Sequence, residues 1–572
     1  MSRPGAFRKI AWIVAACLAA LGALLWLSRF RGRESLQQWK ARMTARGERF
    51  GIDELAPPLA RRDTNLDELI AAGDQLRGRS FNPADYLEFN FSAPGEARPK
   101  WLGTNLVGGY PRTTSTWAQV TAELESARPD LDAVRASLQR PADSSINNYH
   151  GPIARNFLQK RVAAQWLVCE ALGRLHAGDL VSAQAAVLAL ARMARLHQDD
   201  LTIVNQMIRA AIGGLGFEVT WAALQSPGWT ETQLAELQGE WERVAYIEKM
   251  PRMIEMERAQ TLELFESART NGLRQARTVT GGTPFRGSSR DLKAVFEQEF
   301  LDPVRRLAWA ERDELFYLEN TQRVLEAIRR ARAEKSWLSV SGEMVATYDA
   351  MQARLSAFDS FLYPLSGMTM ANYRRAWENI MRQETQRSLL ISALALHRYQ
   401  LRHGRFPPDL ESLAPEFLAA VPLDFMNGQP LRYRLEPGGS FRLYSVGADG
   451  VDDGGNPAPV KAWKAYWTIW EGRDAVWPRM ATPDAARSAP DAEVLQRVQF
   501  TDAPVSDVIE TLAGYAGVRA QIDTALDLRS YPPVTRCLEN ITALGALEAI
   551  LKSNWLVLVR QPGTNLVGIT TR

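Results

Sequence analysis

The sequence has few of the residues that build disulfides or metal sites. Its 572 residues include three cysteines and five histidines, so a disulfide framework is excluded and a histidine-rich metal site is not expected. It also lacks the short motifs that hold phosphate, zinc or an activated serine, since no GxxxxGK[ST], HExxH, GxSxG or CxxC pattern occurs. These absences argue against the commoner enzyme classes, and we predict a protein that is not an enzyme.

No charge of one sign dominates the chain. The 68 Lys and Arg residues nearly balance the 65 Asp and Glu residues, and the formal charge of +3 argues against a nucleic-acid partner. The mean hydropathy of −0.24 excludes a polytopic membrane protein but allows a single span. A chain of this length has room for several domains with sizeable cores.

Long apolar runs are lacking apart from one near the N-terminus. Residues 10–27 contain no charge and would form a helix of about 27 Å, close to the thickness of a bilayer core. We predict a cytoplasmic N-terminus over 1–9 and an uncleaved transmembrane helix over 10–28. Two alternatives stay open, because the basic N-terminus also suits a cleaved signal peptide and Val14–Cys17 resembles a lipoprotein cleavage box.

The charges around this run do not agree on its orientation. Residues 1–49 contain ten basic and two acidic residues, and seven of the basic residues follow the span, which would place the C-terminal side in the cytoplasm. The basic residues Arg3, Arg8 and Lys9 argue for the opposite orientation. The two C-terminal modules described below favour the second arrangement, so we expect an inner-membrane protein whose bulk is periplasmic.

The middle of the chain has the periodicity of helices. We expect residues 29–100 to be a mixed juxtamembrane segment and residues 101–384 to form a large all-α domain of stacked helical hairpins. Apolar residues recur at three- and four-residue spacing over 158–175. Thr230 and Gln233 have the spacing of a capping box at a helix start.

Three features of the helical region could be mistaken for functional sites. Gly213–Gly216 lies in an apolar run rather than after a strand, which indicates close helix packing rather than a nucleotide loop. His150 lies in a polar turn, and we expect it to have a structural role. Trp166, Trp221 and Trp241 fall on helical stripes and are expected in the core.

Residues 385–480 follow a different pattern. A helix ends at Gly404, and short strand-like runs follow, separated by turns such as Asn427-Gly428, which is typical of a small antiparallel sheet. These motifs, with Arg405–Pro408 and the later Tyr444–Gly450, resemble in their order the C-terminal part of the major pseudopilin of type II secretion systems. The prepilin signature of that family is missing from the N-terminal apolar run, so we do not expect polymerisation through that helix.

The pseudopilin resemblance implies a calcium site, because the acidic loop of that family binds calcium. Asp449 matches the aspartate of the family's GADG motif, and Asn456 lies where a later ligand is expected, while Asp452 and Asp453 are further candidates. Asp474–Trp477 resembles the family's closing motif. The residues alone allow the same inference, since Ca²⁺ takes six to eight oxygen ligands on a flexible loop. A solvated acidic turn would use the same residues, and both interpretations stay open.

The last part of the chain changes its period again. After an Ala/Pro-rich linker over 481–493, residues 494–572 have the pattern of strands and two helices in the order β-α-β-β-α-β-β. We expect Asp502 and Thr542 to cap the two helices and Cys537 to be buried in a strand.

This order resembles the short N-terminal domain of secretins and of TonB-dependent receptors. The resemblance rests on three stretches, Phe500–Ile509, Val518–Asp523 and Leu538–Leu551. In that family the domain is a periplasmic contact module without catalytic residues, and an exposed sheet edge offers one route to a partner.

The sequence therefore predicts a multidomain protein with a transmembrane helix, a large all-α domain and two small α+β modules. The expected function is that of a non-enzymatic scaffold or adaptor, whose protein partners would be a secretin or pseudopilins of a type II secretion or pilus-like machinery. Two alternatives remain, a calcium-dependent structural protein of the cell envelope, and an enzyme or ligand-binding protein with its site in the helical domain.

Overall fold

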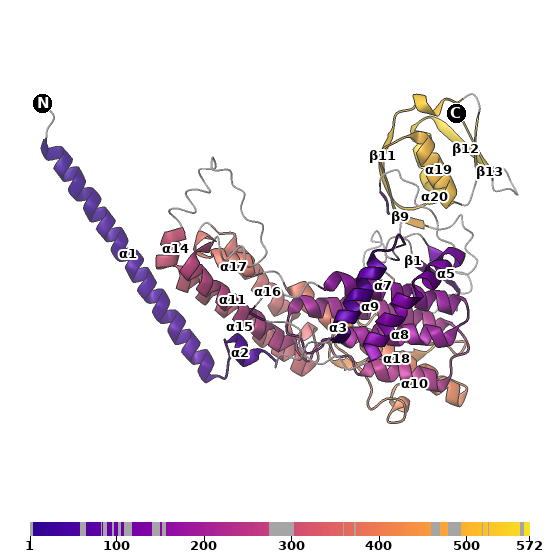
Figure 1. Cartoon of the computed structure of the whole chain (residues 1–572), viewed down its shortest axis with the longest axis horizontal. Helices are drawn as coiled ribbons and strands as arrows, with labels where there is room; N and C mark the ends of the chain where they lie inside the picture. Colours follow the sequence, from indigo (N-terminus) through magenta and orange to yellow (C-terminus); the bar gives the residue numbers. More distant parts are fainter. Residues whose placement is uncertain are drawn as a thin grey trace.

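A computed structural model describes residues 4–57, 64–81, 83, 88–93, 96–100, 105–107, 117–139, 149–150, 156–273, 302–357, 360–370, 373–458, 469–478, 494–516, 519–523, 526–560 and 566–571. The fold is mostly helical, with an apolar N-terminal helix and small sheets that lie mainly in the C-terminal part (Figure 1). This agrees with the coarse architecture that the sequence predicts. The predicted linker over 481–493 lies outside the described residues.

The N-terminal helix α1 (Pro4–Ala45) is longer than the predicted span. It continues without a break for 42 residues, or about 63 Å. Two of the described helices are long and apolar enough to cross a membrane, α1 and α9 (Ile203–Gln225). The apolar window of α9 is 61% buried, which marks it as a core helix, whereas that of α1 is fully exposed. Among the described helices α1 is therefore the candidate for a membrane span or a signal sequence.

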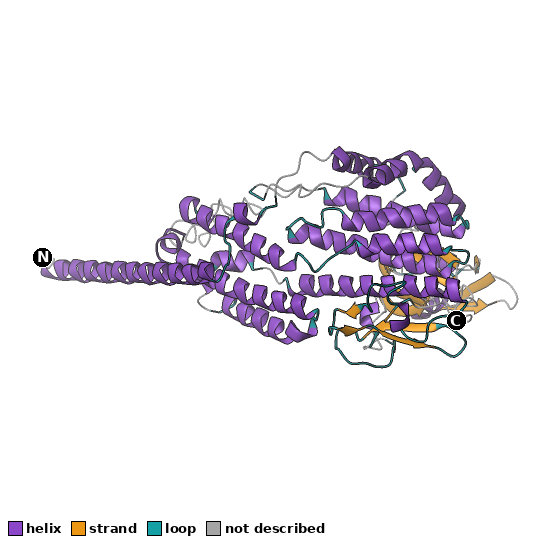
Figure 2. Cartoon of the chain, turned by 90° about the horizontal axis from the view of Figure 1, so that it is seen from below, coloured by secondary structure: helices purple, strands orange, loops and turns teal. Residues whose placement is uncertain are grey.

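Consecutive helices joined by short turns make up the body (Figure 2). The side chain of Asp179 accepts a hydrogen bond from the N–H of Ser182 and so caps a helix, and Thr230 forms the predicted capping box with Gln233. The helices after α1 are α2 (Ile52–Leu55), α3 (Thr64–Arg77), α5 (Trp117–Ser126), α6 (Arg128–Gln139), α7 (Phe157–His176), α8 (Leu180–Arg195), α9, α10 (Glu231–Glu242), α11 (Met250–Asn271), α14 (Asp302–Ala308), α15 (Ala310–Glu334), α16 (Leu338–Leu355), α17 (Pro364–Thr369) and α18 (Arg374–His403).

One hydrophobic core joins most of these helices. Trp166 and Trp241 are fully buried in it, as predicted, whereas Trp221 is half-buried and packs at its edge. Two glycines of α9, Gly213 and Gly216, lie where an aromatic side chain approaches the backbone of this helix. A Cβ on Gly216 would lie 2.6 Å from the ring of Trp241, so the predicted close helix packing is confirmed there.

The region predicted as juxtamembrane and all-α also contains strands. A hairpin of β1 (Glu88–Ala93) and β2 (Glu96–Lys100) precedes β3 (Asn105–Val107). Strand β3 pairs in parallel with β9 (Val494–Ala503), far along the chain. The purely helical description of 101–384 is therefore wrong at its start, because β3 completes a sheet of the C-terminal module.

The described part of residues 385–480 packs as part of the helical body. The predicted boundary at 384/385 falls inside α18, which ends at Gly404 in the expected left-handed conformation with φ of 74°. Trp477 stacks on Phe217 of α9 with ring centroids 4.2 Å apart, so the segment shares the main core. Its strands are β4 (Leu423–Asp424), β5 (Gln429–Pro430), β6 (Arg432–Leu435), β7 (Phe441–Ser445) and β8 (Ala475–Val476), and β6-β7-β8 form an antiparallel sheet.

The C-terminal module has its own core, made only of residues from 495 onward. Its elements follow the predicted order, and its strands form two sheets of order β11-β9-β3 and β10-β13-β12. The elements are β9, α19 (Val505–Tyr515), β10 (Arg519–Ile522), β11 (Val534–Thr542), α20 (Ala543–Ser553), β12 (Leu556–Arg560) and β13 (Leu566–Thr571).

Two local predictions in this module are wrong and one is confirmed. Asp502 does not cap α19, because it belongs to β9 with φ of 53° and its N–H donates to the hydroxyl of Thr535. Cys537 is exposed, because it alternates along β11 with Leu538, the residue that packs against the core. Thr542 caps α20 as expected, with its hydroxyl 3.0 Å from the N–H of Gly545.

Candidate functional site

The four predicted calcium ligands lie on one loop between β7 and β8, but three of them, Asp449, Asp452 and Asn456, are used in local turns. The Asp449 carboxylate accepts a hydrogen bond from the N–H of Val451 at 3.1 Å. The side-chain oxygen of Asn456 accepts one from the N–H of Ala458 at 3.0 Å. Both are the short-range contacts of an Asx turn, which is the alternative that the sequence left open.

The other two candidates face arginines. Asp452 lies 3.2 Å from Arg432 and accepts a hydrogen bond from the hydroxyl of Tyr444 at 3.0 Å. Burial opposes ionisation of Asp452, but its hydrogen bonds and Arg432 outweigh that effect and lower its pKa. Asp453 lies 3.5 Å from Arg473. Within the described residues no group of three or more His, Cys, Asp or Glu side chains is placed to hold a metal ion, and calcium stays a prediction.

The buried carboxylate of Asp474 binds backbone N–H groups of this loop. Asp474 is fully buried and accepts backbone N–H groups of Gly455 at 2.8 Å and Asn456 at 2.9 Å. A second buried carboxylate, that of Asp424, accepts hydrogen bonds from the backbone N–H groups of Met426 and Val446, next to the end of β7. Burial raises the pKa of both carboxyls. The loop is therefore held by the protein's own hydrogen bonds.

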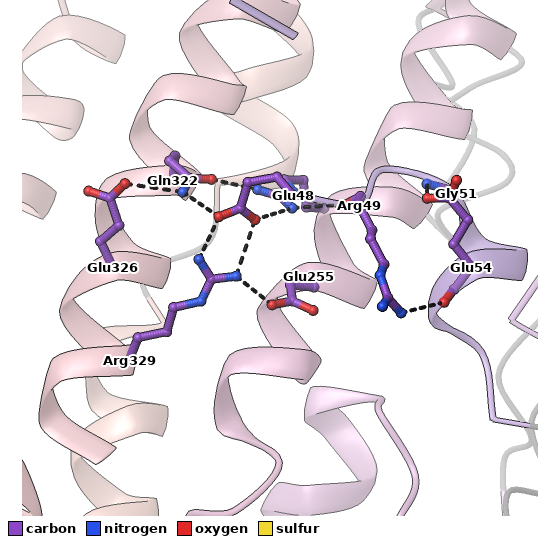
Figure 3. A network of polar contacts seen from close by, with 9 residues as sticks. Glu48, Arg49, Gly51, Glu54, Glu255, Gln322, Glu326 and Arg329 are labelled. Carbon is purple, nitrogen blue, oxygen red and sulfur yellow. Dashed lines mark hydrogen bonds and ion pairs between the residues drawn. The ribbon is translucent and has the colours of Figure 1, made fainter. Parts of the chain in front are cut away.

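The second candidate site is the junction between α1 and the body. Glu48, three residues after α1, is buried and accepts hydrogen bonds from Arg258, Gln322 and Arg329 (Figure 3). Arg258 is itself fully buried, with its guanidinium 3.0 Å from Glu48 and 4.6 Å from the ring centroid of Phe50. Burial raises the pKa of Glu48, but these hydrogen bonds outweigh it and lower the pKa to about 2.

The last turns of α1 also pack against the helical body. Leu36, Trp39 and Met43 are buried in a hydrophobic cluster with residues of α11, α15 and α17. Lys40 forms an ion pair with the buried Glu314 of α15 at 2.5 Å. The exposed apolar part of α1 and its packed part are thus one continuous helix, so a membrane span would connect to the body without a flexible linker.

The third candidate is a cavity of about 40 Å³ in the helical body. It is lined by Glu257 and by the aromatic side chains of Tyr317, Tyr348, Tyr373 and Trp377. Glu257 accepts a hydrogen bond from the hydroxyl of Tyr373 at 3.0 Å, and no ion pair joins it to a cation within the described residues. Burial raises the pKa of Glu257. A carboxylate among aromatic faces suits a small cationic group.

His150 has the structural role expected of it. Its two ring nitrogens lie 2.8 Å from Glu263 and 2.9 Å from Asp53, so it links α11 to α2. Hydrogen bonds to both carboxylates raise the pKa of the imidazole.

Sequence reasoning missed Glu48 and Glu257. One signal for Glu48 was available, because it is one of two acidic residues in the basic first 49 residues. Glu257 had no such signal, since the cavity residues come from six helices and from the segment between α17 and α18. Comparison with family models, with curated proteins and with solved structures gives no match to this chain.

Proposed function

We propose that this chain is a non-enzymatic scaffold anchored in the inner membrane by α1, with its bulk in the periplasm. The observation that carries the proposal is the continuity of α1, which runs unbroken from an exposed apolar segment into a packed one. We propose an uncleaved anchor rather than a cleaved signal sequence because the apolar run continues without a break into the turns of α1 that pack on the body.

The scaffold role follows from where the chain places its modules. The C-terminal module lies at the far end of the body from α1 in both views (Figures 1 and 2). The packed junction around Glu48 would fix the body's orientation relative to the bilayer. We propose that the modules contact a secretin or pseudopilins of a secretion or pilus-like machinery, and the two resemblances in sequence support this choice of partner.

The proposal is tested in two steps. Protease treatment of spheroplasts should digest the body while leaving a fragment that contains α1, and a body protected from protease would contradict a periplasmic location. Cross-linking in intact envelopes followed by purification of the full chain should then recover a secretin or a pseudopilin. Recovery of neither would argue strongly against the machinery as partner.

A second candidate function is binding of a small cation in the helical body. It is favoured by the cavity around Glu257, whose carboxylate has a hydrogen bond from Tyr373 and no cationic partner within the described residues. The volume admits a group of a few heavy atoms, such as a methylated ammonium. Titration of the full chain with methylammonium, followed by tryptophan fluorescence, should saturate, and Glu257→Gln should abolish the saturation.

Calcium binding at the acidic loop remains a third proposal. An ion would have to replace Arg432 beside Asp452 and Arg473 beside Asp453, since these pairs hold the carboxylates in the present arrangement. Calcium should then raise the melting temperature of the full chain, and Asp452→Asn should remove that effect. A melting temperature that does not move with calcium would exclude the site.

A further inference from the structure

The contact between α1 and α14 fixes the level of the body relative to the proposed span. The hydroxyl of Ser28 donates to the carbonyl of Ala308 at 3.4 Å. Ser28 directly follows the uncharged run 10–27, whose length matches a bilayer core, so Ala308 lies at the boundary between hydrocarbon and headgroups. This step rests on the proposed function, because it requires α1 to span the membrane.

Apolar side chains are exposed at this same level. Leu307, next to Ala308, is 58% exposed, and Phe361 is 37% exposed. Phe361 is held in place by its neighbours, because its ring contacts Trp309 edge-on at 5.5 Å and its carbonyl accepts a hydrogen bond from Arg305. Exposed leucine and phenylalanine beside a membrane span are typical of a segment that enters the bilayer interface.

Basic side chains lie on α1 close to the level of this apolar patch. Arg29, Arg31 and Arg33 are exposed on the part of α1 that directly follows the span, and no ion pair ties them to another described residue. The guanidinium of Arg305 is used within the protein, because it donates to the carbonyl of Phe361. Guanidinium groups at this depth match the phosphates of anionic lipids in charge and in geometry.

We infer that α14 and Phe361 form a second membrane contact, which inserts Leu307 and Phe361 into the interface and binds anionic headgroups through Arg29, Arg31 and Arg33. The chain would then touch the bilayer at two places, the span and this patch. Two contacts on one body restrict its rotation about α1, so the C-terminal module would be held in a fixed direction over the membrane.

The test measures lipid contact at single sites in the full chain. The exposed cysteines Cys17 and Cys537 are replaced by serine, and a fluorophore is attached at Leu307→Cys, Leu21→Cys or Val181→Cys. Leu21 lies in the proposed span, whereas Val181 is 72% exposed on α8, at the other end of the body from α1 (Figure 1). Each labelled protein is reconstituted in vesicles of neutral or anionic lipid with brominated chains, which quench only fluorophores in contact with lipid.

We expect bromolipid to reduce the emission at least twofold at Leu307, as at Leu21, and to leave Val181 unchanged. The reduction at Leu307 should be larger in anionic than in neutral vesicles, and equal values would overturn the role of the arginines. Quenching at Leu21 without quenching at Leu307 overturns the second contact but leaves the anchor intact. Loss of quenching at both sites overturns the anchor as well. A blue-shifted but unquenched label at Leu307 would mean that protein covers the patch, which also contradicts lipid contact.

Discussion

At the scale of single residues, the carboxylate of Glu48 accepts hydrogen bonds from three side chains, those of Arg258, Gln322 and Arg329. Replacement of Glu48 by glutamine leaves the fully buried Arg258 without its anionic partner. Breaking a buried pair in this way costs about 3–5 kcal/mol in the free energy of unfolding, because the remaining charge is neither solvated nor paired. Denaturant unfolding of the full chain, followed by circular dichroism, measures this loss.

A matched control separates burial from simple loss of charge. Glu248 also pairs with an arginine, Arg332, but both side chains are about half exposed. Glu248→Gln should therefore cost less than about 1 kcal/mol. Equal effects of the two substitutions would show that the Glu48 network adds nothing beyond a surface pair.

The same residue predicts a dependence of stability on pH. The pKa of Glu48 is about 2 in the fold against an ordinary value of 4.5, so its ionised form stabilises the folded state. That stabilisation is complete above pH 4.5 and is lost as the pH falls toward 2, and it amounts to about 3 kcal/mol. The difference in unfolding free energy between wild type and Glu48→Gln should therefore shrink over this window. A difference that stays constant from pH 7 to pH 2.5 would contradict the assigned pKa.

The pKa of Glu257 is shifted in the opposite direction to that of Glu48. Burial raises its pKa, so ionisation at neutral pH opposes folding, and the loss of stability sets in as the pH rises above its ordinary value. We expect Glu257→Gln to increase the free energy of unfolding at pH 7, by an amount on the order of 1 kcal/mol. The gain should vanish at pH 4, where the carboxyl of the wild type is protonated, and a gain that is independent of pH would exclude this explanation.

At the scale of elements, the path of α9 through the core depends on glycine. A Cβ on Gly216 would meet the ring of Trp241 at 2.6 Å, and Trp241 is fully buried, so the ring has no free space to move into. Gly216→Ala should therefore destabilise the body by about 1–3 kcal/mol, the usual cost of overpacking a core. A shift in the midpoint of thermal or denaturant unfolding reports it.

The neighbouring helix α10 supplies the control. Gly239 lies in that helix, and a Cβ there would have no heavy atom within 4 Å. Gly239→Ala should leave stability unchanged or raise it by up to about 1 kcal/mol, because alanine favours the helical backbone. If both alanine variants behaved alike, close packing at Gly216 would not be the cause.

At the scale of the whole molecule, the sequence predicted elements better than it predicted their association. The caps at Thr230 and Thr542 and the left-handed Gly404 are signalled by neighbouring residues, so they could be predicted and are confirmed. The Glu48 junction, the Glu257 cavity and the pairing of β3 with β9 join residues far apart in the chain. No local pattern encodes such contacts, because they depend on how the finished elements pack.

The boundary at 384/385 failed for the same physical reason, and it leads to a prediction about truncation. The sequence pattern that begins within α18 predicts a new domain there, but α18 contributes to the main core along most of its length. Residues 404–478 add a further set of buried side chains to that core, namely Leu410, Leu413, Phe417, Leu418, Phe425, Met426, Leu431, Phe441, Leu443, Ile469, Ala475 and Trp477. Each large one contributes about 1.5–3 kcal/mol, so their sum exceeds the usual stability of a domain.

A chain that ends at residue 403 should therefore fail to fold, whereas one that ends at residue 493 should keep the body intact. The second truncation removes the C-terminal module, whose hydrophobic core is separate from that of the body. Within the described residues, the strand pairing that joins this module to the earlier part of the chain is that of β3 with β9, over three residues. Calorimetry of the full chain should show two transitions, and the chain ending at 493 should retain only the one that belongs to the body. A folded chain ending at 403 would mean that the division lies before residue 404, near the predicted boundary at 384/385. A single transition in the full chain would mean that the body and the C-terminal module unfold together.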